Sequence, residues 1–198
     1  MTGTTAPIVN FGGELVALGP LRREAIPQYV RWMNDFGTTR TLAVQPRPMT
    51  REQEEAWYEQ AATNEADRTF SIIERTTGRI VGNCDMVNIS LPHRRAEVGI
   101  VIGEPDARGR GYGTEAMRLL VDYAFTVAGM HSLMLWVYEF NQAARRCYEK
   151  VGFREVGRRR QSRWLNGRFW DEIAMDLLAV EFESPVLRAL LETGLPNR

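Results

Sequence analysis

The sequence predicts a single α/β domain, and three properties of the chain support this fold class. With 198 residues, 44% of them hydrophobic, the chain is long enough to enclose a sizeable core. Strand patterns and helix patterns alternate along it instead of falling into separate blocks. No internal repeat, low-complexity tract or linker-like segment divides it. We therefore expect one domain over residues 14–178, a flexible segment at 1–13 and a tail at 179–198 that carries a short helix.

The first third of the chain predicts one strand and two helices. The expected elements are a strand at 14–18, a helix from 22 to about 36 and a helix from 51 to about 63. Gly19 and Pro20 form a turn after the strand. Two prolines within residues 37–49 predict a loop, and Thr50 with Gln53 forms a capping box at the start of the second helix.

The remaining elements alternate regularly. The expected strands are 69–74, 79–87, 96–102, 132–138, 153–161 and 168–177, and the expected helices include 116–125 and 142–151. Segment 132–138 is nearly continuous in apolar residues, which is typical of a strand buried on both faces. Asn166 and Gly167 predict the turn between the last two strands.

Charge and composition disfavour several function classes. The chain carries 25 basic and 25 acidic side chains, so no overall field favours a nucleic acid or a membrane as partner. Its two cysteines and two histidines lack metal-ligand spacing, so we expect no metal site. No stretch approaches the roughly 18 apolar residues of a membrane span, and the first residues lack a signal-peptide pattern. We expect a cytoplasmic protein.

A glycine-rich loop, DARGRGYGTEA at residues 106–116, lies between the strand at 96–102 and the next helix. Glycine lets a ligand approach the backbone closely, and the first amides of a helix have no internal partner, which favours binding of an anion. Arg108 and Arg110 add cations that suit a pyrophosphate. The loop lacks the Gly-Lys-Ser or Gly-Lys-Thr ending of a P-loop and the G-x-G-x-x-G spacing of dinucleotide-binding folds.

Two motifs resemble signatures of the GNAT family of N-acetyltransferases. Arg108, Gly111 and Gly113 match the acyl-CoA loop of that family, in which Arg or Gln is followed by two residues, Gly, one residue, and Gly or Ala. The segment NQAARRCYEKVGF at 141–153 matches the second signature, N-x-x-A-x-x-x-Y-E-K-x-G-F, at every named position.

Further segments resemble one branch of this family, which contains ribosomal-protein N-terminal acetyltransferases and spermidine N-acetyltransferases. They are WMND at 32–35, RAEVG at 95–99 and NGRFWD at 166–171. The resemblance covers residues 14–178 and leaves the tail unexplained.

The resemblance implies a mixed sheet of about seven strands with helices on both faces. Its fourth strand, 96–102, would carry a bulge and splay from the fifth, 132–138, so that the pantetheine arm of acetyl-CoA lies between them as an added strand. The implied acetyl-CoA-binding residues are Val98, Ile100, Val101, Ile102, Arg108, Gly109, Arg110, Gly111, Tyr112, Gly113, Thr114, Asn141, Arg145 and Tyr148. Arg145 and Lys150, of which only Arg145 belongs to this set, are also explained as solvated residues on a helix.

Acetyl transfer to an aliphatic ammonium needs a proton acceptor for the amine and a proton donor for the departing thiolate. Tyr148 is the candidate donor, Glu97 the candidate proton acceptor or acceptor-binding group, and Asn141 could orient the pantetheine or a water. Each also has a structural interpretation: Tyr148 as a core residue, Glu97 as a solvated strand end and Asn141 as an N-cap. Cys147 is turned about 100° from Tyr148 on a helix, which disfavours an acetyl-cysteine mechanism.

The acceptor is expected near the loop at 34–47 and the last hairpin at 164–171, and the candidate acceptor-binding residues are Asn34, Asp35, Glu97 and Glu139. Arg40 and Arg47 would instead suit an acceptor that carries a carboxylate or phosphate. A polyamine, a protein N-terminus, an amino acid and an amino sugar all remain open.

Two rival interpretations have other consequences. A non-catalytic acyl-CoA sensor on the same fold would bind CoA without turnover. RNA binding through the basic run at 158–164 is disfavoured, because a strand divides these charges between two faces. We also expect a homo-oligomer, either a dimer or a larger assembly.

Overall fold

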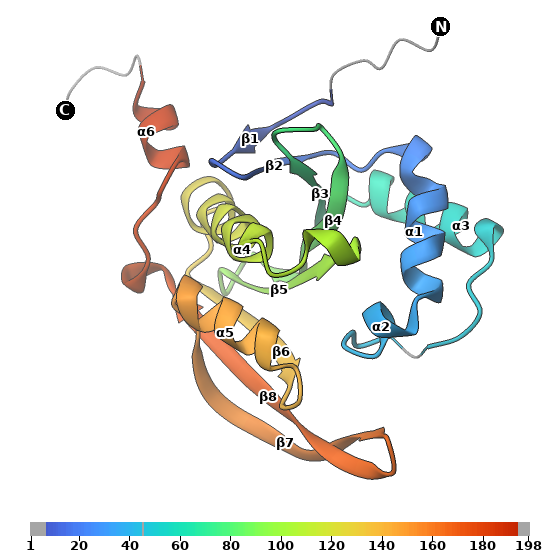
Figure 1. Ribbon diagram of the computed structural model, residues 1–198. Helices are drawn as coiled ribbons and strands as arrows, with labels where there is room; N and C mark the ends of the chain where they lie inside the picture. The colour runs from blue at the N-terminus through green and yellow to red at the C-terminus, as the bar shows by residue number, and fades with distance from the viewer. Residues whose placement is uncertain (1–6, 45, 194–198) are drawn as a thin grey trace, which may run out of the picture.

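The computed structural model describes residues 7–44 and 46–193, which form one sheet of eight strands with helices around it (Figure 1). The strands are β1 (Phe11–Gly12), β2 (Val16–Gly19), β3 (Arg68–Glu74), β4 (Ile80–Ser90), β5 (Arg95–Ile102), β6 (Ser132–Tyr138), β7 (Arg154–Leu165) and β8 (Arg168–Leu178). The helices are α1 (Ile26–Asn34), α2 (Phe36–Thr39), α3 (Arg51–Thr63), α4 (Tyr112–Asp122), α5 (Gln142–Val151) and α6 (Leu187–Glu192). The strand order is β1-β2-β3-β4-β5-β6-β8-β7. The predicted fold class is confirmed, and β1, with two residues, accounts for the strand beyond the expected seven.

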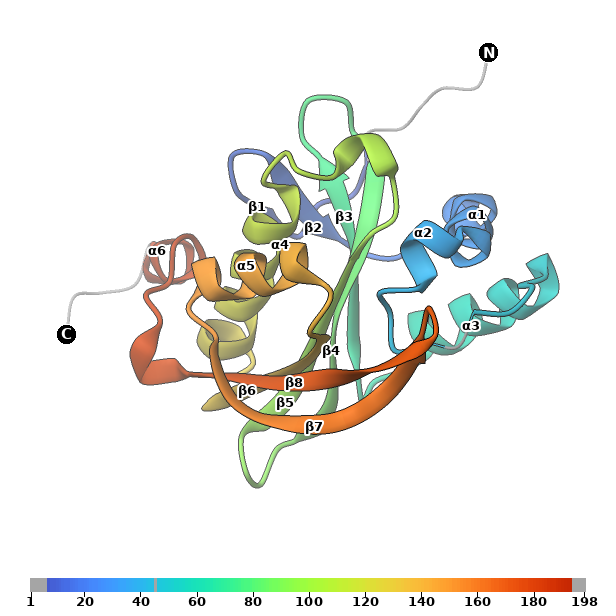
Figure 2. The same ribbon diagram turned by 60° about the horizontal axis from the view of Figure 1, so that its bottom comes forward.

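Helices cover both faces of the sheet (Figures 1 and 2). On β3, Ile72 belongs to the main core, which also contains apolar residues of α4 and α5. The next residue, Ile73, belongs to a second core with apolar residues of α1. Because successive strand residues point to opposite faces, α4 and α5 lie on one side of the sheet and α1 on the other, where α3 packs beside it.

The sheet opens between β5 and β6. These strands run parallel and pair only over Arg95–Glu97 with Ser132–Met134, whereas β6 pairs with β8 along its whole length. Beyond Glu97, β5 pairs only with β4. The expected splay is therefore present. The expected bulge lies elsewhere: the β4–β5 register shifts between Val87 and Ser90, so the extra residue belongs to β4, where an asparagine adopts a φ of 51°.

The helix expected at 22–36 is divided in two. α1 ends at Asn34, and the Asp35 carboxylate accepts hydrogen bonds from the backbone N–H groups of Gly37 and Thr38 at 3.1 and 3.0 Å. An aspartate in extended conformation that caps a new helix ends the previous one. The short α2 therefore occupies part of the segment that the sequence predicted as loop.

The final hairpin is longer than expected. β7 continues past its predicted end at 161 because Gln161 adopts a φ of 52° and the register shifts between Arg159 and Arg163, which lets pairing resume. At the turn, Asn166 and Gly167 have φ values of 52° and 76°, as a two-residue hairpin turn requires.

The tail after β8 packs on the domain through Asp122. This carboxylate is fully buried and accepts hydrogen bonds from the backbone N–H groups of Val186 and Leu187 at 3.1 and 2.9 Å. Leu187 itself is buried in the main core. Within residues 7–44 and 46–193, no helix combines the length and apolar character needed to cross a membrane.

Candidate active site

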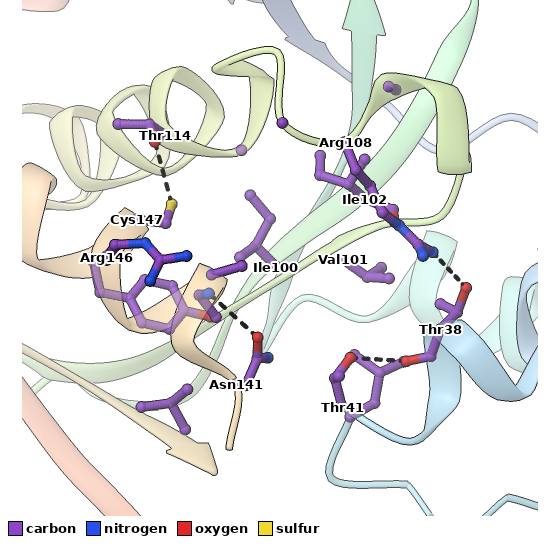
Figure 3. Close-up of a pocket in the computed structure, with 18 of the residues that line it drawn as sticks. Thr38, Thr41, Ile100, Val101, Ile102, Arg108, Thr114, Asn141, Arg146 and Cys147 are labelled. Carbon is purple, nitrogen blue, oxygen red and sulfur yellow. Dashed lines mark hydrogen bonds between the residues drawn. The ribbon is translucent and has the colours of Figure 1, made fainter. Parts of the chain in front are cut away.

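A cavity of about 500 Å³ lies where β5 and β6 separate (Figure 3). Its walls come from α2 and the following loop, the outer part of β5, the glycine loop, the end of β6, and α5. The lining therefore combines α2, which packs beside α1, with α5, which lies on the other side of the sheet. The predicted site residues that line it are Ile100, Val101, Ile102, Arg108, Gly109, Gly111, Gly113, Thr114, Asn141 and Tyr148.

The backbone of the glycine loop is shaped for close approach of a ligand. Gly109 and Gly111 have φ values of 73° and 86°, which glycine adopts without the steric cost of a side chain. Gly111 is the N-cap of α4, so the first N–H groups of this helix have no partner within it and carry partial positive charge. A pyrophosphate fits this helix end, which makes the loop suitable for the phosphates of CoA.

The arginine and tyrosine side chains of the loop point in two directions. Arg108 lies across the cavity mouth, where Nε donates to the Ile102 carbonyl at 3.0 Å and Nη2 donates to Thr38 Oγ1 at 2.7 Å (Figure 3). Arg110 and Tyr112 instead reach the buried carboxylate of Glu74, at 3.2 and 2.5 Å. Neither side chain lines the cavity, because both anchor the loop on β3.

A second carboxylate fixes the start of α4. Glu115 accepts hydrogen bonds from the backbone N–H groups of Glu14, Leu15 and Val16 at 2.9, 2.7 and 2.6 Å. These contacts attach the first turn of α4 to the entry of β2. The helix N-terminus is thereby held toward the cavity.

α5 presents Asn141 and Tyr148 to the cavity. Asn141 Oδ1 accepts a hydrogen bond from the Ala144 N–H at 3.2 Å, so its N-cap role is present. Tyr148 is 6% exposed, and burial raises its pKa, with smaller contributions from Cys147 and Asp85. The phenol is therefore protonated at neutral pH, and no residue in the described part of the chain accepts a hydrogen bond from it. Its free hydroxyl can face a ligand in the cavity as a proton donor, and the raised pKa makes it a weaker acid than an exposed tyrosine.

The basic residues of α5 are placed differently from one another. Arg146 and Lys150 line the cavity, whereas Arg145 forms an ion pair with Glu155 at 3.5 Å outside it. Arg145 is thus a predicted residue that the structure does not bring to the cavity, and Arg146 is one that sequence reasoning missed. Its spacing of four from Lys150 was the available signal, since residues four apart share a helix face.

Two predicted acceptor-binding residues, Asn34 and Asp35, form hydrogen bonds that fix the backbone after α1. Asn34 Nδ2 donates to the Met49 carbonyl at 2.9 Å and its Oδ1 accepts from the Met49 N–H at 3.0 Å, which closes the loop. The Asp35 carboxylate caps α2, and a hydrogen bond from the Thr38 hydroxyl is the main cause that lowers its pKa. Neither residue lines the cavity.

The remaining predicted residues occupy three positions. Glu139 Oε1 accepts a hydrogen bond from the Asp171 N–H at 3.1 Å and so joins the end of β6 to β8. Val98 is buried in the main core. Glu97 is the last β5 residue paired with β6, and it points to the face of the sheet that carries α1, because its neighbours on β5 point into the main core.

Thr38 lies in the loop at 34–47 where the acceptor was expected, although it was not singled out, and sequence reasoning missed the wall formed by Trp136. α2 gave no periodic signal, because it has only four residues. In the described part of the chain, no group of three or more His, Cys, Asp or Glu residues could hold a metal ion.

The cleft between the splayed strands thus has the N-terminus of α4 at one side and the buried Tyr148 at the other. The acetyltransferase (GNAT) domain model matches residues 16–154. The chain belongs to this family, as the motifs predicted, and it is an N-acetyltransferase.

Similar proteins come from both parts of the expected branch. Spermidine N(1)-acetyltransferase of Escherichia coli (strain K12) is 31% identical over 160 residues, which cover 81% of this chain and 84% of the relative. The putative ribosomal N-acetyltransferase YdaF of Bacillus subtilis (strain 168) is 30% identical over 106 residues, 54% of this chain and 57% of the relative. The crystal structure of spermidine N-acetyltransferase from Vibrio cholerae in complex with CoA and spermine has a TM-score of 0.78 at 25% identity, and the match covers 85% of this chain and 98% of that one.

Proposed function

We propose that this enzyme transfers the acetyl group of acetyl-CoA to a primary amine of a polyamine, by direct attack within a ternary complex. The observation that carries the proposal is the single cavity that joins the glycine loop and Tyr148 through the splayed strands. The relatives named for spermidine support the polyamine as acceptor class.

In this proposal the glycine loop binds the pyrophosphate of CoA at the N-terminus of α4, and Arg146 and Lys150 add positive charge nearby. The unpaired edge of β5 beyond Glu97 offers backbone groups to the pantetheine arm, as an added strand would use them. This places the thioester near Tyr148. A backbone N–H of β5 can then stabilise the oxyanion that forms during attack.

The chemistry requires three proton transfers, the first from the ammonium group to a proton acceptor. The amine loses one proton, attacks the carbonyl carbon and forms the new C–N bond; collapse of the oxyanion then breaks the C–S bond. Tyr148 donates its proton to the departing sulfur and regains one from the nitrogen, so the products are the N-acetylated amine and CoA thiol. The buried, protonated phenol fits this role.

The test is thiol release from acetyl-CoA with polyamines, amino acids, amino sugars and peptides with free N-termini as acceptors. We expect turnover with polyamines and its loss in Tyr148→Phe, while CoA binding is unchanged. Turnover with amino acids or amino sugars alone would contradict the polyamine and agree with Arg40, which lines the cavity. CoA binding without turnover in any class would contradict catalysis and support the sensor interpretation.

A further inference from the structure

One carboxylate near the splay has no protein cation to balance it. Asp85 lies on β4 and is partly buried. It points to the face that carries α1, since its neighbours Cys84 and Met86 point into the main core. Within residues 7–44 and 46–193, no ion pair or side-chain hydrogen bond reaches it. A partly buried carboxylate whose charge is not balanced by a cation is costly, so this position favours a cationic ligand.

The residue of β5 opposite Asp85 is a glycine, which leaves room for this carboxylate. Asp85 pairs with Gly99 on β5, and a Cβ atom at Gly99 would lie 2.5 Å from Asp85 Oδ1. Any side chain at this position would therefore displace the carboxylate. Gly99 lies two residues beyond Glu97, where β5 leaves β6, and Val101 on the same strand face lines the cavity. Asp85 thus covers the backbone of β5 at the beginning of the unpaired section.

Asp85 lies beside the cavity and not in its lining: its partner Gly99 is two residues from Val101, which lines the cavity. Burial raises the pKa of Asp85, the charge of Asp67 adds to this effect, and the backbone amide of Gly99 opposes it. A carboxylate with a raised pKa accepts a proton more readily than an exposed one.

We propose that Asp85, in the space that Gly99 leaves open, binds the reacting ammonium group of the acceptor and takes its proton before attack. The inference rests on the proposed function and names the residue that performs its first step. The N–H bond breaks with its electron pair left on nitrogen, the proton moves to a carboxylate oxygen of Asp85, and solvent later removes it. Glu97, on the same sheet face, is left to bind the acceptor.

The test compares two diamines, one ordinary and one with two fluorines beside the reacting amino group. Fluorination lowers the pKa of this amine, so at mildly alkaline pH it needs no proton acceptor. In Asp85→Asn we expect kcat/KM with the ordinary diamine to fall about 10²–10⁴-fold, and with the fluorinated diamine less than about tenfold. The matched control is Asp176→Asn, which removes the charge of a half-buried strand aspartate outside the cavity lining and should leave both rates close to wild type.

A second pair of variants tests whether the absence of a side chain at Gly99 is needed to position the Asp85 carboxylate. Gly99→Ala should lower activity with the ordinary diamine, and the same change in an Asp85→Ala background should add little, because the displaced group is gone. Melting temperatures and CoA affinity establish that each variant is folded. Equal loss with both diamines, no loss in Asp85→Asn, or additive losses in the double variant would overturn the proposal. Inactivity of the wild-type enzyme with both diamines would instead overturn the proposed function, and this inference with it.

Discussion

Gly111→Ala is the sharpest test of how the glycine loop binds CoA. Gly111 has a φ of 86°, and a left-handed backbone costs a residue with a side chain about 1–2 kcal/mol. An added Cβ would lie 3.3 Å from Leu15 Cδ1, a close contact that a small movement relieves. The variant can escape the strain by rotating the peptide groups at the α4 N-terminus. Binding must restore their orientation, so CoA affinity should fall about 5- to 30-fold, the equivalent of 1–2 kcal/mol.

The assay is calorimetric titration with CoA beside thermal unfolding, and Gly129→Ala is the matched control. Gly129 has a φ of 67°, and a Cβ there would meet no atom within 4 Å. Gly129→Ala should melt roughly 2–8 °C below wild type, as about 1–2 kcal/mol implies for a chain of this size, and Gly111→Ala should melt closer to wild type because its loop relaxes. Only Gly111→Ala should lose affinity. Unchanged affinity in Gly111→Ala, or an equal loss in Gly129→Ala, would refute the assignment of the α4 amides to the phosphates.

Three further predictions follow from single groups. Tyr148→Phe should lower kcat about 10²–10⁴-fold with CoA affinity unchanged, measured by thiol release and titration. Asp122→Ala leaves two backbone donors of the tail helix unpaired and should lower stability by about 3 kcal/mol, measured by urea unfolding; an unchanged midpoint would show that the tail contributes nothing. Hydrogen bonds from Thr77 and Tyr112 lower the pKa of Glu74, so its stabilisation is complete above the unfolded value of about 4.3 and is lost as the pH falls through the folded pKa. Glu74→Gln should therefore lower the melting temperature at neutral pH, and its difference from wild type should shrink in acid.

Most of the fold could be predicted because the signals are local. The capping box of α3 has both of its hydrogen bonds, and the strand at 132–138 has the predicted bounds. Gly152 ends α5 with a φ of 118°, as its position after the helical pattern indicated. The predicted helix boundaries are wrong where one residue is compatible with two local structures. Asp35 resembles an ordinary polar residue in a helix, but it caps a new one, and nothing in the periodicity distinguishes the two.

The candidate site was predicted less completely, because a motif identifies positions in the sequence and not the directions in which their side chains point. Arg108 and Arg110 lie two residues apart in one loop, and both were expected to bind acetyl-CoA, although only Arg108 occupies a motif position. In the structure the first lies across the cavity, and the second joins Tyr112 at Glu74. The difference is decided by β3, which is more than thirty residues away and supplies a buried carboxylate that no loop pattern contains.

The proposed role of Asp85 could not be predicted from the sequence either. Its strand reads as an ordinary alternation of apolar and polar residues, and a polar residue on the polar face of a strand carries no signal of function. Its significance comes from three non-local facts: the register that places it against Gly99, the end of β5–β6 pairing at Glu97, and the absence of a neighbouring cation among the described residues. A glycine that leaves room for a carboxylate, and a carboxylate that has no counter-charge, are each unremarkable alone. Together they mark the position, on the sheet face opposite α5, where we propose that the ammonium group of the acceptor binds.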